Sequence, residues 1–198
     1  MTLRFGVFNY GAGNLFSIRA ALRKEGVTPV LTRDGKGMAE ADALVLPGVG
    51  SFDQAARSLP LERAREVIGS GKPVMGICLG LQIFYESSEE GSARGLSLLE
   101  GRVRRFPSSV KVPQIGWNTL ALGGDSELTD GVADGSWVYY VNSYVPESHE
   151  GVVATSAYGV EFPALVARGN VFGAQFHPEK SGAVGRRVLQ NFIRAAKR

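Results

Sequence analysis

The first half of the chain alternates short apolar runs with segments whose apolar residues recur at helical spacing. The apolar runs predict strands over residues 4–8, 28–31, 43–46 and 74–77. The helical spacing predicts helices over residues 14–25 and 61–68, and another that Ser51 caps and that breaks near Pro60. Because parallel strands need a crossover between them, this alternation predicts a parallel sheet covered by helices on both faces.

The second half is rich in short predicted strands that are separated by turn residues. These strands cover residues 101–106, 117–122, 137–141, 151–156, 164–168 and 171–176, and an amphipathic helix over residues 184–197 follows them. No repeat, low-complexity tract or linker interrupts the chain. We therefore expect one domain over residues 1–198, an α/β fold with a doubly wound, mostly parallel sheet, helices on both faces and an additional β-rich second half.

Composition excludes several classes of protein. Of the 198 residues, 44% are hydrophobic and 21% are charged, which is ordinary for a globular domain. The single cysteine excludes an internal disulfide. The first residues predict a strand rather than a signal peptide, and no apolar stretch approaches the length of a membrane span. The net charge of +3 comes without the basic and aromatic interleaving that favours nucleic-acid binding. We expect a soluble cytoplasmic protein that binds neither nucleic acid nor membrane.

The only cysteine, Cys78, stands where a predicted strand meets a helical pattern over residues 81–86. Gly76 and Gly80 flank it and tolerate a cramped backbone. Strand, abrupt turn and helix form the arrangement of a nucleophile elbow, here with cysteine in place of serine. The helix N-terminus then faces the thiol and favours its thiolate. The alternative interpretation is a buried structural cysteine, because free cysteine is often a small core residue.

A candidate base for this thiol follows the last predicted strand. His177 ends that strand and Glu179 stands two residues further on, so both side chains would point the same way in an extended chain. Pro178 between them disfavours helix at His177. His177 would take and return the proton of Cys78, and Glu179 would orient the imidazole, as in a catalytic triad. A strand-end histidine beside a surface glutamate is the alternative.

The segment Pro47-Gly48-Val49-Gly50 ends another predicted strand, and open parallel sheets place their sites at such ends. Its glycines permit a backbone that points an N–H group into a site. The Leu79 N–H, at the start of the elbow helix, would be a second donor. We therefore expect Gly48, Val49, Gly50 and Leu79 to stabilise an oxyanion.

Cofactor sites find little support in the sequence. The segment Gly11-Ala12-Gly13 follows the first predicted strand, but Phe16 occupies the place of the third glycine of a dinucleotide site. One cysteine and two histidines lack the usual zinc-binding spacings. We expect neither a cofactor nor a metal.

Together these segments resemble the class I (triad) glutamine amidotransferases. The resemblance rests on Gly76-Ile77-Cys78-Leu79-Gly80 with Gln82, followed by His177-Pro178-Glu179. Over nearly the whole chain, further motifs resemble the glutaminase subunits of imidazole glycerol phosphate synthases. These motifs are Gly13-Asn14-Leu15 with Ser17, Pro47-Gly48-Val49-Gly50, Lys111-Val112-Pro113 with Gly116-Trp117-Asn118, Tyr140-Val141-Asn142-Ser143-Tyr144, and Phe172-Gly173-Ala174-Gln175-Phe176-His177-Pro178-Glu179-Lys180-Ser181.

The resemblance implies that glutamine is hydrolysed to glutamate and ammonia through a cysteinyl thioester. Cys78 would be the nucleophile, His177 the acid and base, and Glu179 the residue that orients His177. The implied substrate contacts are Gly50, Leu79, Gln82, Glu90, Ser143 and Tyr144. Glu90 would meet the substrate ammonium, and a solvated acidic run over residues 86–90 is the alternative.

The resemblance also implies a partner. In the family, ammonia passes to a cyclase subunit with a (β/α)8 barrel, which forms a heterodimer with the glutaminase. That subunit makes imidazole glycerol phosphate and an aminoimidazole carboxamide ribotide in histidine biosynthesis. The glutaminase is nearly silent until the partner binds its ligand. The implied interface and conduit residues are Asn14, Gln114, Trp117, Asn118 and Lys180.

Three other hypotheses remain. Another glutaminase of the superfamily, such as the pyridoxal phosphate synthase subunit, would share the triad but lack Gly116-Trp117-Asn118. A cysteine peptidase of related α/β architecture would cleave peptides rather than release ammonia from glutamine. A binding module with a decayed site is disfavoured, because all three triad residues are present.

Overall fold

The computed structural model describes residues 2–11, 15–48 and 50–198. Its centre is a sheet of eight strands in the order β2-β1-β3-β4-β13-β12-β11-β8. The strands from β2 to β13 run parallel, and β12, β11 and β8 continue the sheet with antiparallel pairing. Their bounds are β1 Arg4–Phe8, β2 Thr28–Thr32, β3 Ala43–Leu46, β4 Val74–Ile77, β8 Ala121–Leu122, β11 Val152–Ala157, β12 Glu161–Arg168 and β13 Val171–Ala174.

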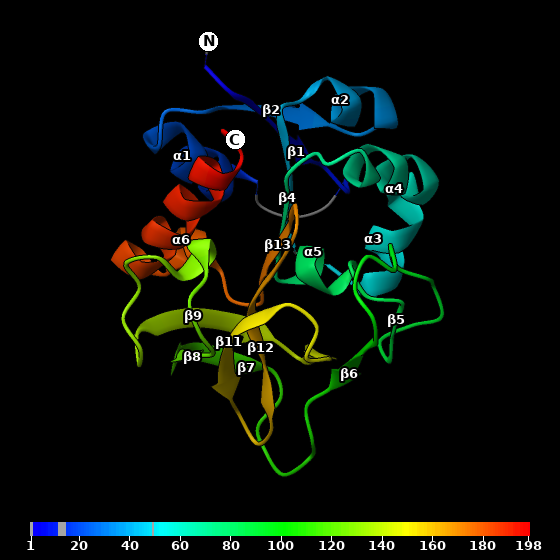
Figure 1. The fold of residues 1–198 in the computed structure, drawn as a ribbon. Coiled ribbons are helices and arrows are strands. Elements are labelled where there is room, and N and C mark those ends of the chain that lie inside the picture. The colour runs from blue at the N-terminus through cyan, green and yellow to red at the C-terminus, as the bar shows by residue number, and fades with distance from the viewer. Residues whose placement is uncertain (1, 12–14, 49) are drawn as a thin grey trace.

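Helices cover both faces of this sheet (Figure 1). On one face lie α1 (Phe16–Lys24) and α6 (Gly182–Ala195); on the other lie α2 (Gly35–Glu40), α3 (Phe52–Ser58), α4 (Leu61–Gly69) and α5 (Leu79–Gln82). Neighbouring residues of a strand pack on opposite faces of the sheet. Val45 belongs to the hydrophobic core under α1 and α6, and Leu44 belongs to the core on the opposite face. The predicted doubly wound α/β fold is confirmed.

Two small sheets lie beyond the end of the central sheet where its parallel strands terminate (Figure 1). One has the order β10-β6-β5 and the other pairs β7 with β9. Their bounds are β5 Ser87–Ser88, β6 Arg102–Arg105, β7 Gln114–Thr119, β9 Trp137–Asn142 and β10 Tyr144–Glu147, and two 3-10 turns are η1 Glu127–Thr129 and η2 Pro178–Lys180. These sheets form the predicted β-rich second half.

Local side chains explain several element starts. The Ser51 hydroxyl accepts a hydrogen bond from the Gln54 N–H at 3.4 Å, so α3 begins at its predicted cap. Asp34 caps α2 in the same way, by accepting from the Gly37 N–H at 2.8 Å. The sequence pattern did not predict α2, because six residues that include two glycines give little helical periodicity.

Several predicted elements are wrong in extent. The strand predicted over residues 164–168, for example, begins at Glu161. The helix after Cys78 ends at Gln82 rather than continuing over residues 81–86. The backbone carbonyls of Ile83 and Phe84 instead accept hydrogen bonds from the N–H groups of residues 96, 98 and 99. The strand predicted over residues 117–122 is divided at Leu120, where the chain changes its partner strand from β9 to β11.

Candidate active site

Cys78 lies on a tight turn between β4 and α5. Its backbone has φ of +52° and ψ of −109°, which side-chain-bearing residues rarely adopt. The flanking glycines are required for close approach rather than for unusual dihedral angles. A Cβ atom on Gly80 would lie 1.7 Å from the Leu46 carbonyl oxygen, and one on Gly76 would lie 2.4 Å from the Gly80 oxygen. The nucleophile-elbow geometry is therefore present.

The thiol of Cys78 is buried and unpaired with any other sulfur, because the chain has one cysteine. Its Sγ atom lies 3.8 Å from the Val141 carbonyl oxygen of β9. The Nε2 atom of Gln175 lies 3.6 Å from the same sulfur. Sequence patterns gave Gln175 no role, because only the fold brings it beneath the elbow.

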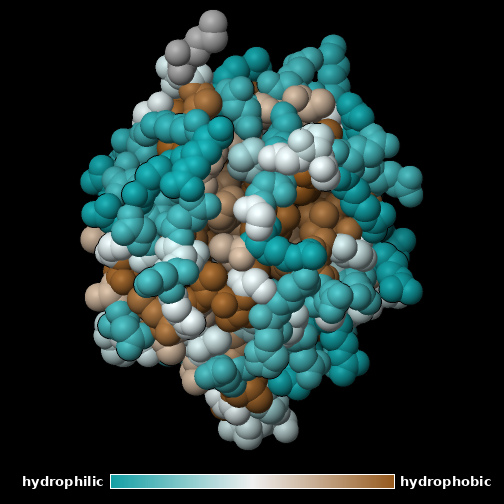
Figure 2. Space-filling model, viewed as in Figure 1, coloured by the Kyte–Doolittle hydropathy of each residue, from teal (hydrophilic) through white to brown (hydrophobic). Residues whose placement is uncertain are grey.

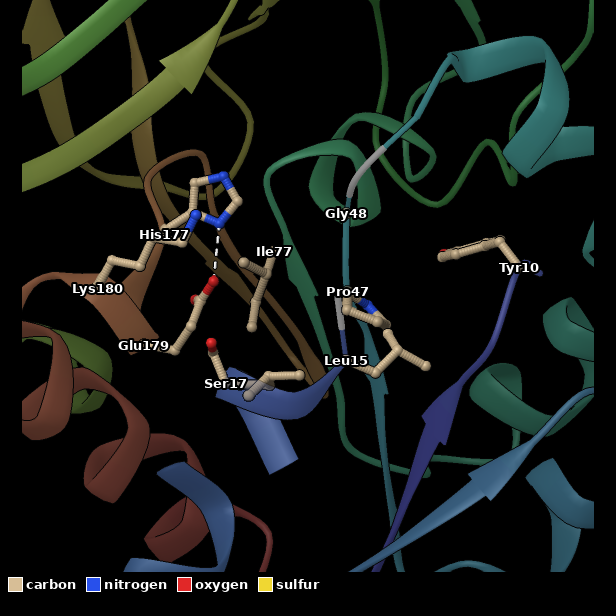
Figure 3. Close-up of a pocket in the computed structure, with 10 residues that line it drawn as sticks. Tyr10, Leu15, Ser17, Pro47, Gly48, Ile77, His177, Glu179 and Lys180 are labelled. Carbon is tan, nitrogen blue, oxygen red and sulfur yellow. Dashed lines mark hydrogen bonds and ion pairs between the residues drawn. The ribbon is translucent and has the colours of Figure 1, made fainter. Parts of the chain in front are cut away.

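His177 and Glu179 come together beside Cys78. The Nδ1 atom of His177 lies 2.9 Å from the Glu179 Oε1 atom (Figure 3). The prediction of an extended chain here is wrong, because residues 178–180 form the 3-10 turn η2 with Pro178 in its first position. The turn still brings both side chains together, and the His177 N–H is anchored on the Tyr139 carbonyl of β9 at 2.9 Å.

The charge state of His177 reflects its two neighbours. Burial lowers the pKa of His177, but hydrogen bonds to Cys78 and Glu179 and the negative charges of both groups raise that pKa more strongly, to about 10. The imidazolium is therefore the stable form near neutral pH. Such a group can give a proton to a departing amine and can then act as a base once that proton has left.

A cavity of about 340 Å³ opens above the thiol. Cys78 and His177 line it together with Gly48, Gly50, Leu79, Gln82, Glu90, Ser143, Tyr144 and Lys180. All six predicted substrate contacts are thus at one cavity, and its size is at the lower end of the range for small-molecule sites.

The expected oxyanion donors lie at the same place. Among the described residues, the Leu79 N–H donates to no other group. A Cβ atom on Gly48 would lie 2.3 Å from both the Ile77 oxygen and the Leu79 nitrogen, so only glycine fits against the elbow. Gly50 has φ of +117°, which favours glycine. Val49 lies outside the described residues.

Two of the predicted substrate contacts also have structural partners. The Glu90 Oε2 atom accepts a hydrogen bond from the Phe52 N–H at 2.7 Å, at the start of α3. The Gln82 Nε2 atom donates to the Tyr144 carbonyl at 2.9 Å and to the Gln175 Oε1 atom at 3.1 Å. These bonds fix both side chains at the cavity wall.

A second, smaller cavity of about 60 Å³ shares Gly48, His177 and Lys180 with the first. Figure 3 shows its wall, where the Ser17 hydroxyl points toward Glu179. Two buried oxygens on its lining have no hydrogen-bond partner among the described residues, Tyr10 Oη and Glu179 Oε2. The cavity therefore offers polar atoms next to the His177–Glu179 pair.

The predicted interface and conduit residues differ in their exposure. Trp117 is 53% exposed on β7, whereas Gln114 is buried. Asn118 bonds within the protein, to the Ala157 carbonyl at 2.9 Å. Lys180 is exposed and lines both cavities. Asn14 lies outside the described residues.

Within the described residues, no group of three or more His, Cys, Asp or Glu side chains is placed to hold a metal ion. None of the helices over those residues has the length and apolarity to cross a membrane.

Solved structures with this fold include a putative GMP synthase protein from Thermoplasma acidophilum, with a TM-score of 0.79, 20% identity, and coverage of 100% of this chain and 95% of that chain. PurLQS from Thermotoga maritima has a TM-score of 0.78 and 25% identity, with coverage of 98% of this chain and 99% of that chain. The first likeness shows the fold alone.

Sequence comparison is more specific. The family profile "Glutamine amidotransferase class-I" matches residues 7–196. An imidazole glycerol phosphate synthase subunit HisH from Archaeoglobus fulgidus is 48% identical over 196 residues, which cover 97% of this chain and 98% of that protein. A HisH subunit from Methanosarcina mazei is 46% identical over 197 residues, which cover 96% of this chain and 98% of that protein. The chain belongs to the class-I glutamine amidotransferase family, among the HisH subunits of imidazole glycerol phosphate synthase.

Proposed function

We propose that this chain hydrolyses L-glutamine to L-glutamate and ammonia in histidine biosynthesis, through a thioester on Cys78. The observation that carries the proposal is the strained Cys78 elbow, whose thiol lies beside His177 on the wall of a cavity of about 340 Å³. Glu179 bonds the Nδ1 atom of His177 at 2.9 Å. Residues 1–198 act as a single type 1 glutamine amidotransferase domain, without cofactor, in the cytoplasm.

The reaction begins when the Cys78 thiolate attacks the side-chain amide carbon of glutamine. The carbonyl oxygen becomes negative and accepts hydrogen bonds from the Leu79 N–H and from the backbone of residues 48–50. Each such donor is worth roughly 3 kcal/mol in a preorganised site. The His177 imidazolium then protonates the departing nitrogen, which leaves as ammonia, and the thioester remains. His177 next takes a proton from water, the resulting hydroxide attacks the thioester, and glutamate leaves as the thiolate re-forms.

The wall of the larger cavity supplies substrate contacts from Gly50, Leu79, Gln82, Glu90, Ser143 and Tyr144. The Glu90 carboxylate meets the substrate ammonium while it keeps its bond to the Phe52 N–H. The fixed orientation of Gln82, which is held by the Tyr144 carbonyl, preorganises one side of the site.

Released ammonia passes to a partner, a cyclase subunit with a (β/α)8 barrel that completes a heterodimer. Protonation in water would end its use as a nucleophile, so a shielded route is required. The small cavity beside His177 and Glu179 begins that route, and Lys180 lines both this cavity and the substrate cavity.

The docking surface for this partner is the exposed face of strands β7 and β9. Ile115 stands opposite Val141 and Trp117 opposite Tyr139, so these side chains share one face. Ile115 is 65% exposed and Trp117 is 53% exposed. Figure 2 shows hydrophobic side chains at the surface of the β-rich region, within a mostly hydrophilic exterior. Apolar groups of this size on a surface mark interaction sites.

The triad is tested by comparing the same substitution at each of the two histidines of the chain. We expect His177→Asn to lower glutaminase kcat at least about a hundredfold, because it removes acid and base. The control His149→Asn leaves kcat unchanged, since His149 is exposed and lies outside the substrate cavity. Cys78→Ser is expected to abolish trapping by an electrophilic glutamine analogue. Full activity in either triad variant, or peptide cleavage without ammonia release, contradicts the proposal.

The partner is tested by assaying glutamine hydrolysis with and without a cyclase protein that carries its nucleotide ligand. We expect strong stimulation, and we expect Ile115→Asp to weaken the complex at least about tenfold, because it buries a charge at the interface. Stimulation by a pyridoxal phosphate synthase partner instead would assign the chain to another amidotransferase.

A further inference from the structure

Gln175 is a buried polar side chain that the proposed mechanism does not use. Its exposed fraction is 0%, and it stands two residues before His177. It lines neither the substrate cavity nor the small cavity beside Glu179. An amide that is withdrawn from water in this way needs partners, because burial of an unpaired amide is costly. Its partners are Gln82 and Cys78.

A chain of hydrogen bonds sets the orientation of this amide. A backbone carbonyl only accepts, so the Tyr144 carbonyl 2.9 Å away requires the Gln82 side chain to turn its NH2 group toward it. The other hydrogen of that NH2 group donates to the Gln175 Oε1 atom at 3.1 Å. The NH2 group of Gln175 is consequently turned to the Cys78 sulfur, at 3.6 Å.

This contact distinguishes the two forms of Cys78. A thiolate accepts an N–H hydrogen bond more strongly than a thiol does, because the bond is charge-assisted. The Val141 carbonyl, 3.8 Å from the sulfur on β9, has the opposite preference, since it can accept only from the protonated thiol. Gln175 therefore favours the reactive form, and the positive charge of His177, which also faces the sulfur, acts in the same direction.

We propose that Gln175 is a positioning residue that holds the Cys78 sulfur and favours its thiolate, in an orientation set by Gln82 and the Tyr144 carbonyl. This inference rests on the proposed function only in taking Cys78 as the nucleophile. A purely structural Gln175 would fill space and satisfy Gln82 without any effect on the ionisation of the thiol.

The experiment measures the rate of iodoacetamide alkylation against pH, by mass spectrometry of the intact chain. Every adduct on a thiol reports Cys78, because the chain has one cysteine. In Gln175→Met, which keeps the length of the side chain but removes its N–H donors, we expect the midpoint of the pH profile to rise by about one unit. The control Gln190→Met removes an amide from α6, where it bonds Glu25, and leaves the midpoint unchanged.

A second variant keeps the test decisive if Gln175→Met does not fold, as judged by circular dichroism. Gln175→Glu retains an acceptor for Gln82 but places carboxylate oxygen against the sulfur, so a larger upward shift is expected. An unchanged midpoint in either folded variant overturns the proposal, even if its melting temperature is lower. The assay contains no glutamine, so its outcome is separate from the failure or success of the glutaminase proposal.

Discussion

The backbone at Cys78 predicts that glycine is better tolerated there than alanine. Both substitutions remove the thiol, so their difference isolates the backbone and the Cβ atom. With φ of +52° and ψ of −109°, a residue with a Cβ atom is strained at this position, by roughly 1–3 kcal/mol. Glycine escapes that strain.

Two smaller effects oppose the gain in stability that glycine obtains from relief of the backbone strain. Glycine loses more conformational freedom on folding, which costs roughly 0.5–1 kcal/mol relative to alanine. The lost methyl group costs little here, because Cys78 lines the open cavity of about 340 Å³ and removal of the methyl group leaves no sealed void. The free energy of unfolding of Cys78→Gly should therefore exceed that of Cys78→Ala by about 1 kcal/mol. In a chain of this length the melting temperature should differ by about 3 °C.

Urea unfolding followed by circular dichroism measures this difference. The matched control is Ala39→Gly on the exposed face of α2, where an ordinary helical backbone predicts a loss of about 1 kcal/mol. The two alanine-to-glycine comparisons should thus have opposite signs. If Cys78→Gly proves no more stable than Cys78→Ala while the control behaves as expected, the elbow is not strained and the reasoning fails.

Three further predictions concern packing and ionisation. Gly48→Ala should lower kcat at least about tenfold and destabilise the fold by about 2 kcal/mol, because its Cβ would lie 2.3 Å from the elbow backbone; unchanged kinetics and melting would contradict this close approach. His177 has a pKa raised to about 10 in the folded state, above about 6.5 when unfolded, so its contribution to stability is complete below the unfolded pKa and is lost as pH rises toward 10. Urea titrations from pH 6 to 10 should therefore show stability falling more steeply in the wild type than in His177→Gln, and parallel profiles would refute the shift. Asn191→Ala should cost about 3 kcal/mol in the same assay, because the Asn191 Nδ2 atom donates to the carbonyls of Leu128 and Asp130 at 2.9 and 2.8 Å; a loss below about 1 kcal/mol would show that water replaces these bonds.

Features that depend on neighbouring residues along the chain were predictable. Strand β3, the Ser51 cap of α3 and the Cys78 turn follow from apolar runs, a capping side chain and flanking glycines. The His177–Glu179 pair was also predictable, although its backbone is a turn and not an extended strand. Short spacing holds the two side chains near each other in either conformation.

Features set by distant segments were not predictable. Helix α5 ends early because N–H groups of the loop over residues 95–99 donate hydrogen bonds to the backbone carbonyls that follow the helix. No local sequence pattern predicts that pairing. Gln175 reaches the sulfur only because β13 lies beside β4 in the sheet, nearly a hundred residues later in the chain. The steric need for Gly48 likewise arises from its contact with the elbow, which no periodicity encodes.

Strand β9 has one further consequence. The carbonyl of Tyr139 holds the His177 N–H, and the carbonyl of Val141 faces the Cys78 sulfur, while the side chains of both residues belong to the exposed face shared with β7. The Cys78 N–H is held separately, by the carbonyl of Ala174 in β13 at 2.7 Å. A shift of β9 would therefore move the anchor of His177 relative to Cys78. A partner that binds this face would thus change the spacing of His177 and Cys78 through the backbone of β9, and exchange of the His177 amide hydrogen with deuterium, before and after the partner binds, would register it.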